Sequence, residues 1–380
     1  MAEYLMDTTD LTKIASAIRA KGGTSDSLVY PDGFVTAIQA IQTGTELQII
    51  VSVASGAAVT ATKGSLSVSG TSINGACTLV VPEGGEWTVS ATLNGATSDS
   101  NIVNVVSSYD TSLAFISTIL NDNSWETIRS ISDAGTGANY WSIGDRKAVT
   151  LNGTVGHLTL SNYTTYAFII GFNHNSSLEG SNRIHFQLAK TALSGGTDVC
   201  FCDNQYSPDR GWSTSGAGYF VMNARNTNSG GWKSSQMRTN ICGTSLSSYS
   251  GTIIAVIPEA LRAVLKSVTK YTDNTGGGGS TASYVTATTD YFFLLSEYEV
   301  FGSISRANSN EASEQAQYAY YAAGNSKIKY EHNNTSAPAV WWLRSPRVGY
   351  RGLFLLVIPD GMLEVGNAEV SLGFTSGFCV

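Results

Sequence analysis

The amino-acid sequence predicts a multidomain α+β protein with a short helical hairpin, a small β-sandwich and a larger C-terminal domain of mixed structure. A length of 380 residues exceeds one ordinary domain. The spacing of apolar residues changes from helical to alternating near residue 45, and it becomes mixed after residue 107. A hydrophobic fraction of 42%, with 10% aromatic residues, is enough to build cores. The expected domains are therefore residues 1–44, 45–107 and 108–380.

The composition argues against two classes of partner. The chain has 22 Lys and Arg residues against 29 Asp and Glu residues, a net charge of −7, and only 13% of its residues are charged. No basic stripe is present that could neutralise phosphates, so nucleic acid is not an expected partner. No run of about 18 apolar residues predicts a membrane span, and Met1–Asp10 lacks the basic and apolar regions of a secretory signal. We expect synthesis in a cytoplasm and no membrane insertion.

The segment 1–44 is predicted to form two amphipathic helices. Asp10 is placed to cap the first helix and Gly22–Gly23 to end it, while Pro31–Asp32–Gly33 leads into the second, which ends before Gly44. The apolar residues at helical spacing are Leu11, Ile14, Ala15 and Ile18, then Phe34, Ala37, Ile38 and Ile41. A unit this small cannot bury both apolar faces alone, so we expect a homo-oligomer.

The segment 45–107 is predicted to be an immunoglobulin-like β-sandwich. Its apolar residues alternate as in half-buried strands, at Ile49/Val51/Val53, Leu66/Val68, Leu79/Val81 and Trp87/Val89/Ala91. Turn signals such as Asn74–Gly75 and Asn94–Gly95 separate these runs. Strands at this spacing are typical of small sandwiches, although the Cys…Trp…Cys pattern of antibody domains is missing. A spacer between the two ends of the chain is the expected role.

The segment 108–380 shows both periodicities and is predicted to be one α+β domain. Helices are expected around Leu113–Ile116–Leu120, after Ser124 at Trp125–Ile128, and after Pro258 at Leu261–Val268. The strand-like runs are Tyr166–Phe172, Ile184–Leu188, Gly251–Ile257, Tyr291–Leu295 and Leu353–Ile358. The run Gly276–Ser280 (GGGGS) is either a flexible native loop or a linker.

No enzymatic activity is expected, because none of the common catalytic or phosphate-binding motifs occurs. The five cysteines are odd in number and irregularly spaced, which favours buried free thiols; Cys200 and Cys202 would share one strand face. Glu297 and Glu299 are predicted to lie at a strand end as solvated or salt-bridged groups. His174, between two asparagines, is predicted to bond within a turn. No catalytic residue, metal site or cofactor is therefore predicted.

The C-terminal motifs resemble those of the variable proteins of diversity-generating retroelements. The motifs in order are W-W-L-R-S-P (341–346), R-V-G-Y-R-G (347–352), L-F-L-L-V-I (353–358), P-D-G (359–361) and G-F-C-V (377–380). Upstream, W-S-I-G-D-R-K (141–147), G-F-N-H-N (171–175), I-P-E-A-L-R (257–262) and F-F-L-L-S-E-Y-E-V-F-G (292–302) extend the resemblance. The N-terminal L-T-K-I-A-S-A-I-R-A-K-G-G (11–23) resembles a leader of phage tail and baseplate proteins.

The resemblance implies a C-type-lectin-like domain, related to the formylglycine-generating-enzyme fold, on a tail-tip protein of a phage virion. It implies a receptor on the host bacterium (protein or glycan) and other tail or baseplate proteins as partners, and a trimer as the favoured oligomer. The segment 347–372 corresponds to the family's variable segment. It departs from the family's Asn-rich template, because it is apolar and aromatic here. The alternatives are a formylglycine-generating-type oxidase and a bacterial surface adhesin of the same fold.

Ligand binding is predicted on the surface that follows the anchor Trp341–Trp342–Leu343. The expected ligand-binding residues are Arg347, Gly349, Tyr350, Arg351, Leu353, Leu356, Ile358 and Glu364. Tyr and Arg are the residue types that dominate binding hot spots. Strand alternation puts Phe354 on the face of Leu356. The family pattern instead makes Phe354 and Val357 core residues and leaves Leu356 and Ile358 exposed, and this second interpretation is the prediction.

Overall fold

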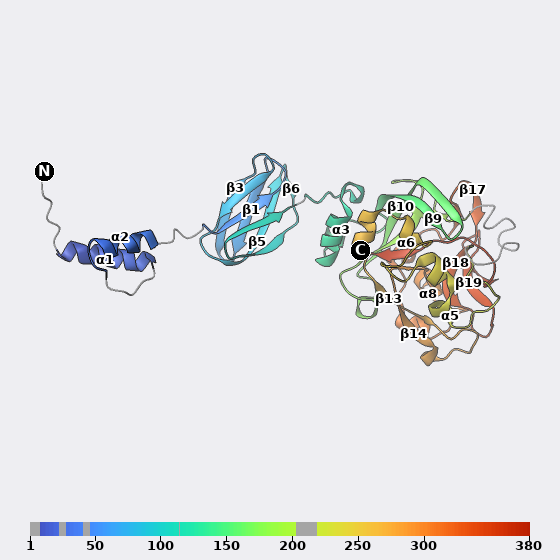
Figure 1. Ribbon diagram of the computed structural model, residues 1–380. Helices are drawn as coiled ribbons and strands as arrows, with labels where there is room; N and C mark the ends of the chain where they lie inside the picture. Colours follow the sequence, from blue (N-terminus) through green and yellow to red (C-terminus); the bar gives the residue numbers. More distant parts are fainter. Residues whose placement is uncertain (1–7, 23–27, 41–45, 114, 203–218) are drawn as a thin grey trace. The chain divides into compact units, whose positions relative to one another are not determined.

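A computed structural model describes residues 8–22, 28–40, 46–113, 115–202 and 219–380 (Figure 1). The chain divides into two compact units, residues 1–116 and 117–380. Both α-helices and β-sheets are present, as the predicted α+β class requires. Within the described ranges no helix is long and apolar enough to cross a membrane.

The N-terminal helices form the predicted hairpin, α1 (Thr8–Gly22) and α2 (Asp32–Ala40). Ala15, Ile18 and Phe34 are buried between them. The prediction that Asp10 caps the first helix was wrong, because α1 begins at Thr8 and Asp10 lies inside its first turn. Gly23, Ile41 and Gly44 lie outside the described residues.

The next segment forms two antiparallel-rich sheets around one core. Its strands are β1 (Gln48–Ser52), β2 (Ala58–Lys63), β3 (Leu66–Thr71), β4 (Ala76–Val80), β5 (Gly85–Leu93), β6 (Ala96–Thr97), β7 (Asn101–Val105) and β8 (Ser108–Ser112). The sheet orders are β4-β1-β8 and β3-β2-β5-β6, with β7 also paired to β5. The core contains the predicted Ile49, Val51, Trp87 and Val89. The predicted boundary at residue 107 falls too early, because β8 pairs in parallel with β1.

The C-terminal unit is built on a five-stranded sheet in the order β15-β21-β11-β10-β9. These strands are β9 (Arg146–Val155), β10 (Leu158–Phe172), β11 (Ile184–Lys190), β15 (Phe292–Phe293) and β21 (Gly377–Cys379). A second sheet, β18-β19-β20, comprises β18 (Trp341–Pro346), β19 (Leu353–Val357) and β20 (Leu363–Asn367). Smaller sheets join β12 (Val199–Cys200), β16 (Lys329–Glu331) and β17 (Asn334–Ala339), and β13 (Val268–Asp273) with β14 (Val285–Asp290). The predicted strand runs near residues 166, 184, 291 and 353 are all found.

Short helices connect these sheets. They are α3 (Trp125–Asp133), α4 (Ser176–Glu179), α5 (Gly231–Ser234), α6 (Ile253–Val256), α7 (Glu259–Val264), α8 (Glu297–Phe301), α9 (Glu311–Glu314) and α10 (Ala319–Ala322), with η1 (Leu120–Asp122), η2 (Gly137–Asn139), η3 (Met237–Cys242) and η4 (Ala282–Tyr284). Ser124 caps α3 by accepting a hydrogen bond from the Thr127 amide, and Pro258 immediately precedes α7, both as predicted. The predicted extent of this last helix was wrong, because α7 ends at Val264 and Val268 begins β13.

Two predicted elements were wrong. The run Gly251–Ile257 contains the helix α6 and not a strand, because Ile253, Ile254 and Val256 are buried on all sides and a continuous apolar run does not distinguish the two. The expected helix around Leu113, Ile116 and Leu120 was wrong, because the Leu113 amide donates to the carbonyl of Ser52 and Phe115 forms an isolated β-bridge with Ser98. Only the short η1 turn begins at Leu120.

Candidate functional site

The predicted site centres on a turn, residues 347–352, that joins β18 to β19. Backbone hydrogen bonds hold the turn in place: the Gly349 amide donates to Gly278 (2.8 Å) and the Val348 amide to Arg306 (3.1 Å). Gly349 has a φ of +77°, which favours glycine. Tyr350 is 52% exposed, and the Arg347 guanidinium lies 4.7 Å from its ring centre. The turn therefore presents its aromatic and cationic side chains from a fixed backbone.

Asn228, which the sequence analysis missed, holds the turn through hydrogen bonds to its backbone carbonyls. Its side-chain amide donates to the carbonyls of Tyr350 (2.6 Å) and Leu353 (2.9 Å). Its backbone amide donates to the carbonyl of Arg351 (2.9 Å). A Cβ at Gly276 would lie only 1.8 Å from the Asn228 carbonyl oxygen, so this close approach requires glycine. The GGGGS segment is thus a packed native loop, and the run of glycines was the signal that could have revealed it.

Two pockets contain predicted ligand-binding residues. The first, here called the polar pocket, has a volume of about 400 Å³ and is lined by Thr227, Asn228, Ser229, Thr275, Gly276, Gly277, Gly278 and Arg351. The second, the apolar pocket, has a volume of about 270 Å³ and is lined by Val340, Leu356, Ile358, Pro359, Glu364, Val365, Gly366, Asn367, Val370 and Leu372. Every predicted ligand-binding residue except Leu353 lies on the turn or in the lining of one of these pockets.

The predicted exposure of Leu356 was wrong. Leu356 is only 4% exposed and Phe354 and Val357 are fully buried, because β19 is the central strand of its sheet, between β18 and β20. Leu356 nevertheless contributes to the wall of the apolar pocket. Ile358 is half-buried at the same pocket. The prediction that Phe354 and Val357 are core residues is confirmed.

The remaining predicted residues link the turn to the apolar pocket. Leu353 pairs with Asn367 and Leu356 with Glu364 across β19 and β20. The two pairs are three positions apart along β19, a distance of about 10 Å. Glu364 forms an ion pair with Arg306, a residue that the sequence analysis did not select. The structure thus gathers all eight predicted residues along one hairpin and its neighbouring edge strand.

A cluster of buried ionisable groups, here called the ion cluster, includes a residue of the strand that leads into the turn: Glu179 on α4, Lys270 on β13, Glu299 on α8 and Arg344 on β18. The Lys270 ammonium lies 2.7 Å from the Glu179 carboxylate and 2.8 Å from that of Glu299. Arg344 forms a second ion pair with Glu299 and donates to Thr272 (2.8 Å). Glu299 was predicted at a strand end, but it lies on a helix with a Ser296 capping box. Four elements are tied together by these contacts.

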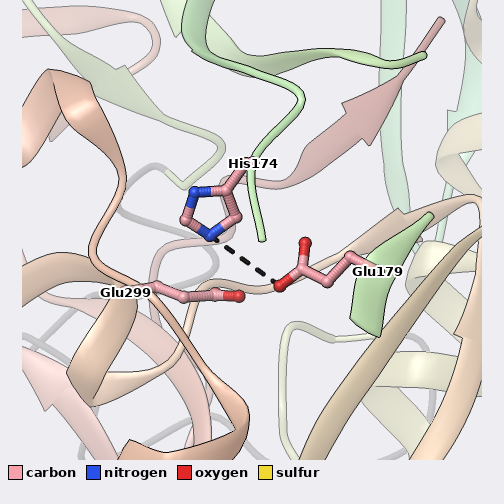
Figure 2. Close-up of side chains that lie close together, drawn as sticks. All are labelled: His174, Glu179 and Glu299. Carbon is pink, nitrogen blue, oxygen red and sulfur yellow. Dashed lines mark ion pairs between the residues drawn. The ribbon is translucent and has the colours of Figure 1, made fainter. Parts of the chain in front are cut away.

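His174, Glu179 and Glu299 are close enough to be considered as metal ligands. Their nearest ligand atoms lie within 4.8 Å of one another, and Figure 2 shows the His174 ring facing the Glu179 carboxylate. The separation of His174 Nε2 from Glu179 is 3.8 Å. However, Lys270 and Arg344 already balance the two carboxylates, so the group needs no added cation. We assign it to the ion cluster, as a structural feature that fixes β18, the strand that leads into the turn.

Burial sets the charge states around the ion cluster. Burial, reinforced by the charge of Lys270, lowers the pKa of His174 to about 3. Burial raises the pKa of Glu179 to about 7, against the opposing effect of Lys270. It also raises the pKa of Glu311 to about 7. For Glu299, burial is outweighed by Arg344 and Lys270, which hold its pKa below the ordinary value.

These shifts predict how the stability of the C-terminal unit depends on pH. His174 is neutral in the folded state. As the pH is lowered through 6.5, its ordinary pKa, the unfolded chain therefore gains a proton before the folded one does, and the free energy of unfolding decreases. Glu179 and Glu311 have the opposite effect: as the pH is lowered from about 7 to 4.5, the folded state gains their protons first, and the free energy of unfolding increases. Glu299 adds to the loss below its ordinary pKa of 4.5. We expect a steep decrease of the free energy of unfolding below pH 4.5.

The variant His174→Phe tests this assignment, since it keeps a ring against Tyr318, 3.8 Å away in the native stack, and cannot titrate. Urea unfolding of the full chain at several acid pH values gives the free energy of unfolding as a function of pH. Its slope should be smaller for the variant than for the unaltered chain, by about 1.4 kcal/mol per pH unit. An unchanged slope would mean that His174 is not buried in its neutral form.

All five cysteines are buried and none forms a disulfide bond, as predicted. The sulfurs of Cys200 and Cys202 are 3.8 Å apart, in agreement with the prediction that they share a face. Cys379 lies 3.3 Å from a ring nitrogen of His185. Burial raises the pKa of the Cys379 thiol to about 12, against the opposing charge of Lys270. Such a thiol is not activated as a nucleophile.

One family model matches part of this region. Residues 218–375 match the sequence model of a family described as a domain of unknown function (DUF6273). The matched range contains the turn, both pockets and Arg344, but not His174 or Glu179. A comparison with curated proteins found no match.

Proposed function

We propose that this chain is a receptor-binding protein of a phage tail, and that its C-terminal unit binds a ligand on the host-cell surface through the turn 347–352. The observation that carries the proposal is the fixed backbone of this turn beneath an exposed Tyr350 and Arg351. Preorganised Tyr and Arg side chains contribute binding energy at a low cost in conformational entropy. The ion cluster supports this role by anchoring β18.

The finer features of the proposal come from the sequence resemblance. We propose a C-type-lectin-like fold for the C-terminal unit and an immunoglobulin-like fold for the sandwich, which would act as a spacer. The two-sheet arrangement of β1–β8 supports the second of these. Of the two alternatives, the oxidase requires a reactive thiol, and the raised pKa of Cys379 weighs against it.

The proposed function is tested by adsorption. Fluorescently labelled full-length chain, mixed with strains that the parent phage infects, should label the cells, and unlabelled chain should slow phage adsorption. Strains resistant through loss of the surface receptor should remain unlabelled. Equal labelling of infected and resistant strains would contradict the proposal.

We propose that the chain acts as a homo-oligomer, with a trimer favoured, since Ile14 and Val35 on the N-terminal helices are 40% and 51% exposed. Light scattering of the full chain should give about three times the monomer mass of 40.2 kDa. The double variant Ile14→Asp/Val35→Asp should lower that mass. A monomer at micromolar concentration for the unaltered chain would contradict the prediction.

A further inference from the structure

The polar pocket offers a cation that no protein group neutralises. Within the described ranges the Arg351 guanidinium has no hydrogen-bond or ion-pair partner, whereas Arg306 is paired with Glu364 and Arg344 with Glu299. Hydroxyl groups of Thr227, Ser229 and Thr275 line the same pocket. A planar guanidinium beside hydroxyl donors is suited to carboxylate or phosphate groups.

The glycine loop adds backbone donors to this pocket. The amides of Thr275 and Gly276 already donate to the Asp273 carboxylate, at 2.9 and 3.1 Å. The next two amides, of Gly277 and Gly278, have no acceptor among the residues that the structure describes. Neither residue has a side chain of its own to cover its amide. Successive amides without an acceptor in the protein are a common feature of anion-binding loops.

Asn228 supplies a second, independent observation. It is 1% exposed and its Oδ1 has no hydrogen-bond partner, although its amide nitrogen makes two bonds. This oxygen would lie 3.1 Å from a Cβ at Gly276 and 3.3 Å from one at Gly277, so only the absence of side chains leaves it next to the pocket. A buried carbonyl oxygen without a donor is costly. It requires a donor such as a hydroxyl group.

Because the pocket combines an unpaired cation and free amides with an unsatisfied acceptor, we infer that it binds an anionic polyol. This ligand carries one carboxylate or phosphate for Arg351 and the loop amides, and hydroxyls for Asn228 and the Ser and Thr side chains. The inference rests on the proposed function, since it names the ligand class of the same surface. Uronic-acid sugars and glycerol phosphates share this chemistry, and both occur as free compounds that can be used as probes.

Calorimetric titration of the full chain with D-glucuronate and with glycerol 3-phosphate tests the inference, with glucose and glycerol as the neutral counterparts. We expect at least one acid to bind at least about tenfold more tightly than its neutral counterpart, and more weakly as salt is added. The tighter acid identifies the carboxylate or the phosphate source. Failure of both acids to bind, or equal binding of acid and neutral compound, would overturn the inference.

Variants locate the binding. Arg351→Gln should weaken the binding of the acid at least about tenfold. Gly277→Ala should weaken it too, because the new Cβ would lie 2.8 Å from Arg351 Cγ at a φ of +65°. Gly279→Ala makes the same change in the same loop with nothing within 4 Å and should bind normally. Unchanged binding by Arg351→Gln, with the thermal midpoint preserved, would place the ligand elsewhere and overturn the inference.

The two proposals fail separately. If labelled chain binds host cells and neither acid binds, the ligand class is wrong and the receptor-binding role stands. If an acid binds at Arg351 and host cells are not labelled, the pocket assignment stands and the role in adsorption is wrong.

Discussion

Replacing Arg344 by Met should lower the free energy of unfolding of the C-terminal unit by about 3–5 kcal/mol. The guanidinium is fully buried and bonds the Glu299 carboxylate, the Thr272 hydroxyl and the Leu294 carbonyl (2.9 Å). Methionine fills similar space but leaves these acceptors without donors, and it leaves Lys270 alone to balance two carboxylates. Urea unfolding followed by tryptophan fluorescence reports on this unit, because every tryptophan except Trp87 lies in it.

Arg306→Met is the matched control for this variant. Arg306 also pairs with a glutamate, Glu364, but their side chains are 31% and 41% exposed. Partly solvated ion pairs contribute about 0–1 kcal/mol, so the control should unfold nearly as the unaltered chain does. If Arg344→Met proved as stable as Arg306→Met, the ion cluster would not be what anchors β18.

The double variant Tyr350→Ala/Arg351→Ala should abolish binding to host cells while the thermal midpoint stays nearly unchanged. Each side chain is exposed on the turn and contributes no core packing. Hot-spot residues of these types cost about 2 kcal/mol or more each when truncated, so affinity should fall at least about a hundredfold. Flow cytometry with labelled full-length protein measures the loss, and differential scanning calorimetry measures the midpoint.

Tyr109→Ala/Lys233→Ala serves as the control, because Tyr109 is also exposed (40%) and Lys233 is an exposed cation. Neither residue lies on the turn or in either pocket. This control should bind cells as the unaltered chain does. Retained binding by the Tyr350/Arg351 variant, or loss of its folded state, would refute the assignment of the site.

Much of the local structure could be predicted from periodicity and turn chemistry. Alternation at Ile49, Val51 and Val53 identified a strand of the sandwich, and the hydroxyl of Ser124 identified the start of α3. The turn that carries Tyr350 and Arg351 was also selected from the sequence. In each case the signal lies within a few consecutive residues, because strand and helix periods and cap bonds are local properties.

The tertiary structure alone decided the rest, because burial and ion pairing depend on residues far apart in the chain. Glu179 and Lys270 are 91 positions apart, and Asn228 and Tyr350 are 122 apart. No local pattern reports that such groups meet, and an isolated charge or amide gives no sign that it will be buried. The same reason explains Leu356: its own strand period left its exposure open, and the pairing of β18 and β20 on either side of β19 buried it. The sequence by itself thus determined the local elements and the chemistry of the turn, while long-range pairing determined which charges are buried together in the ion cluster and which residues line the two pockets.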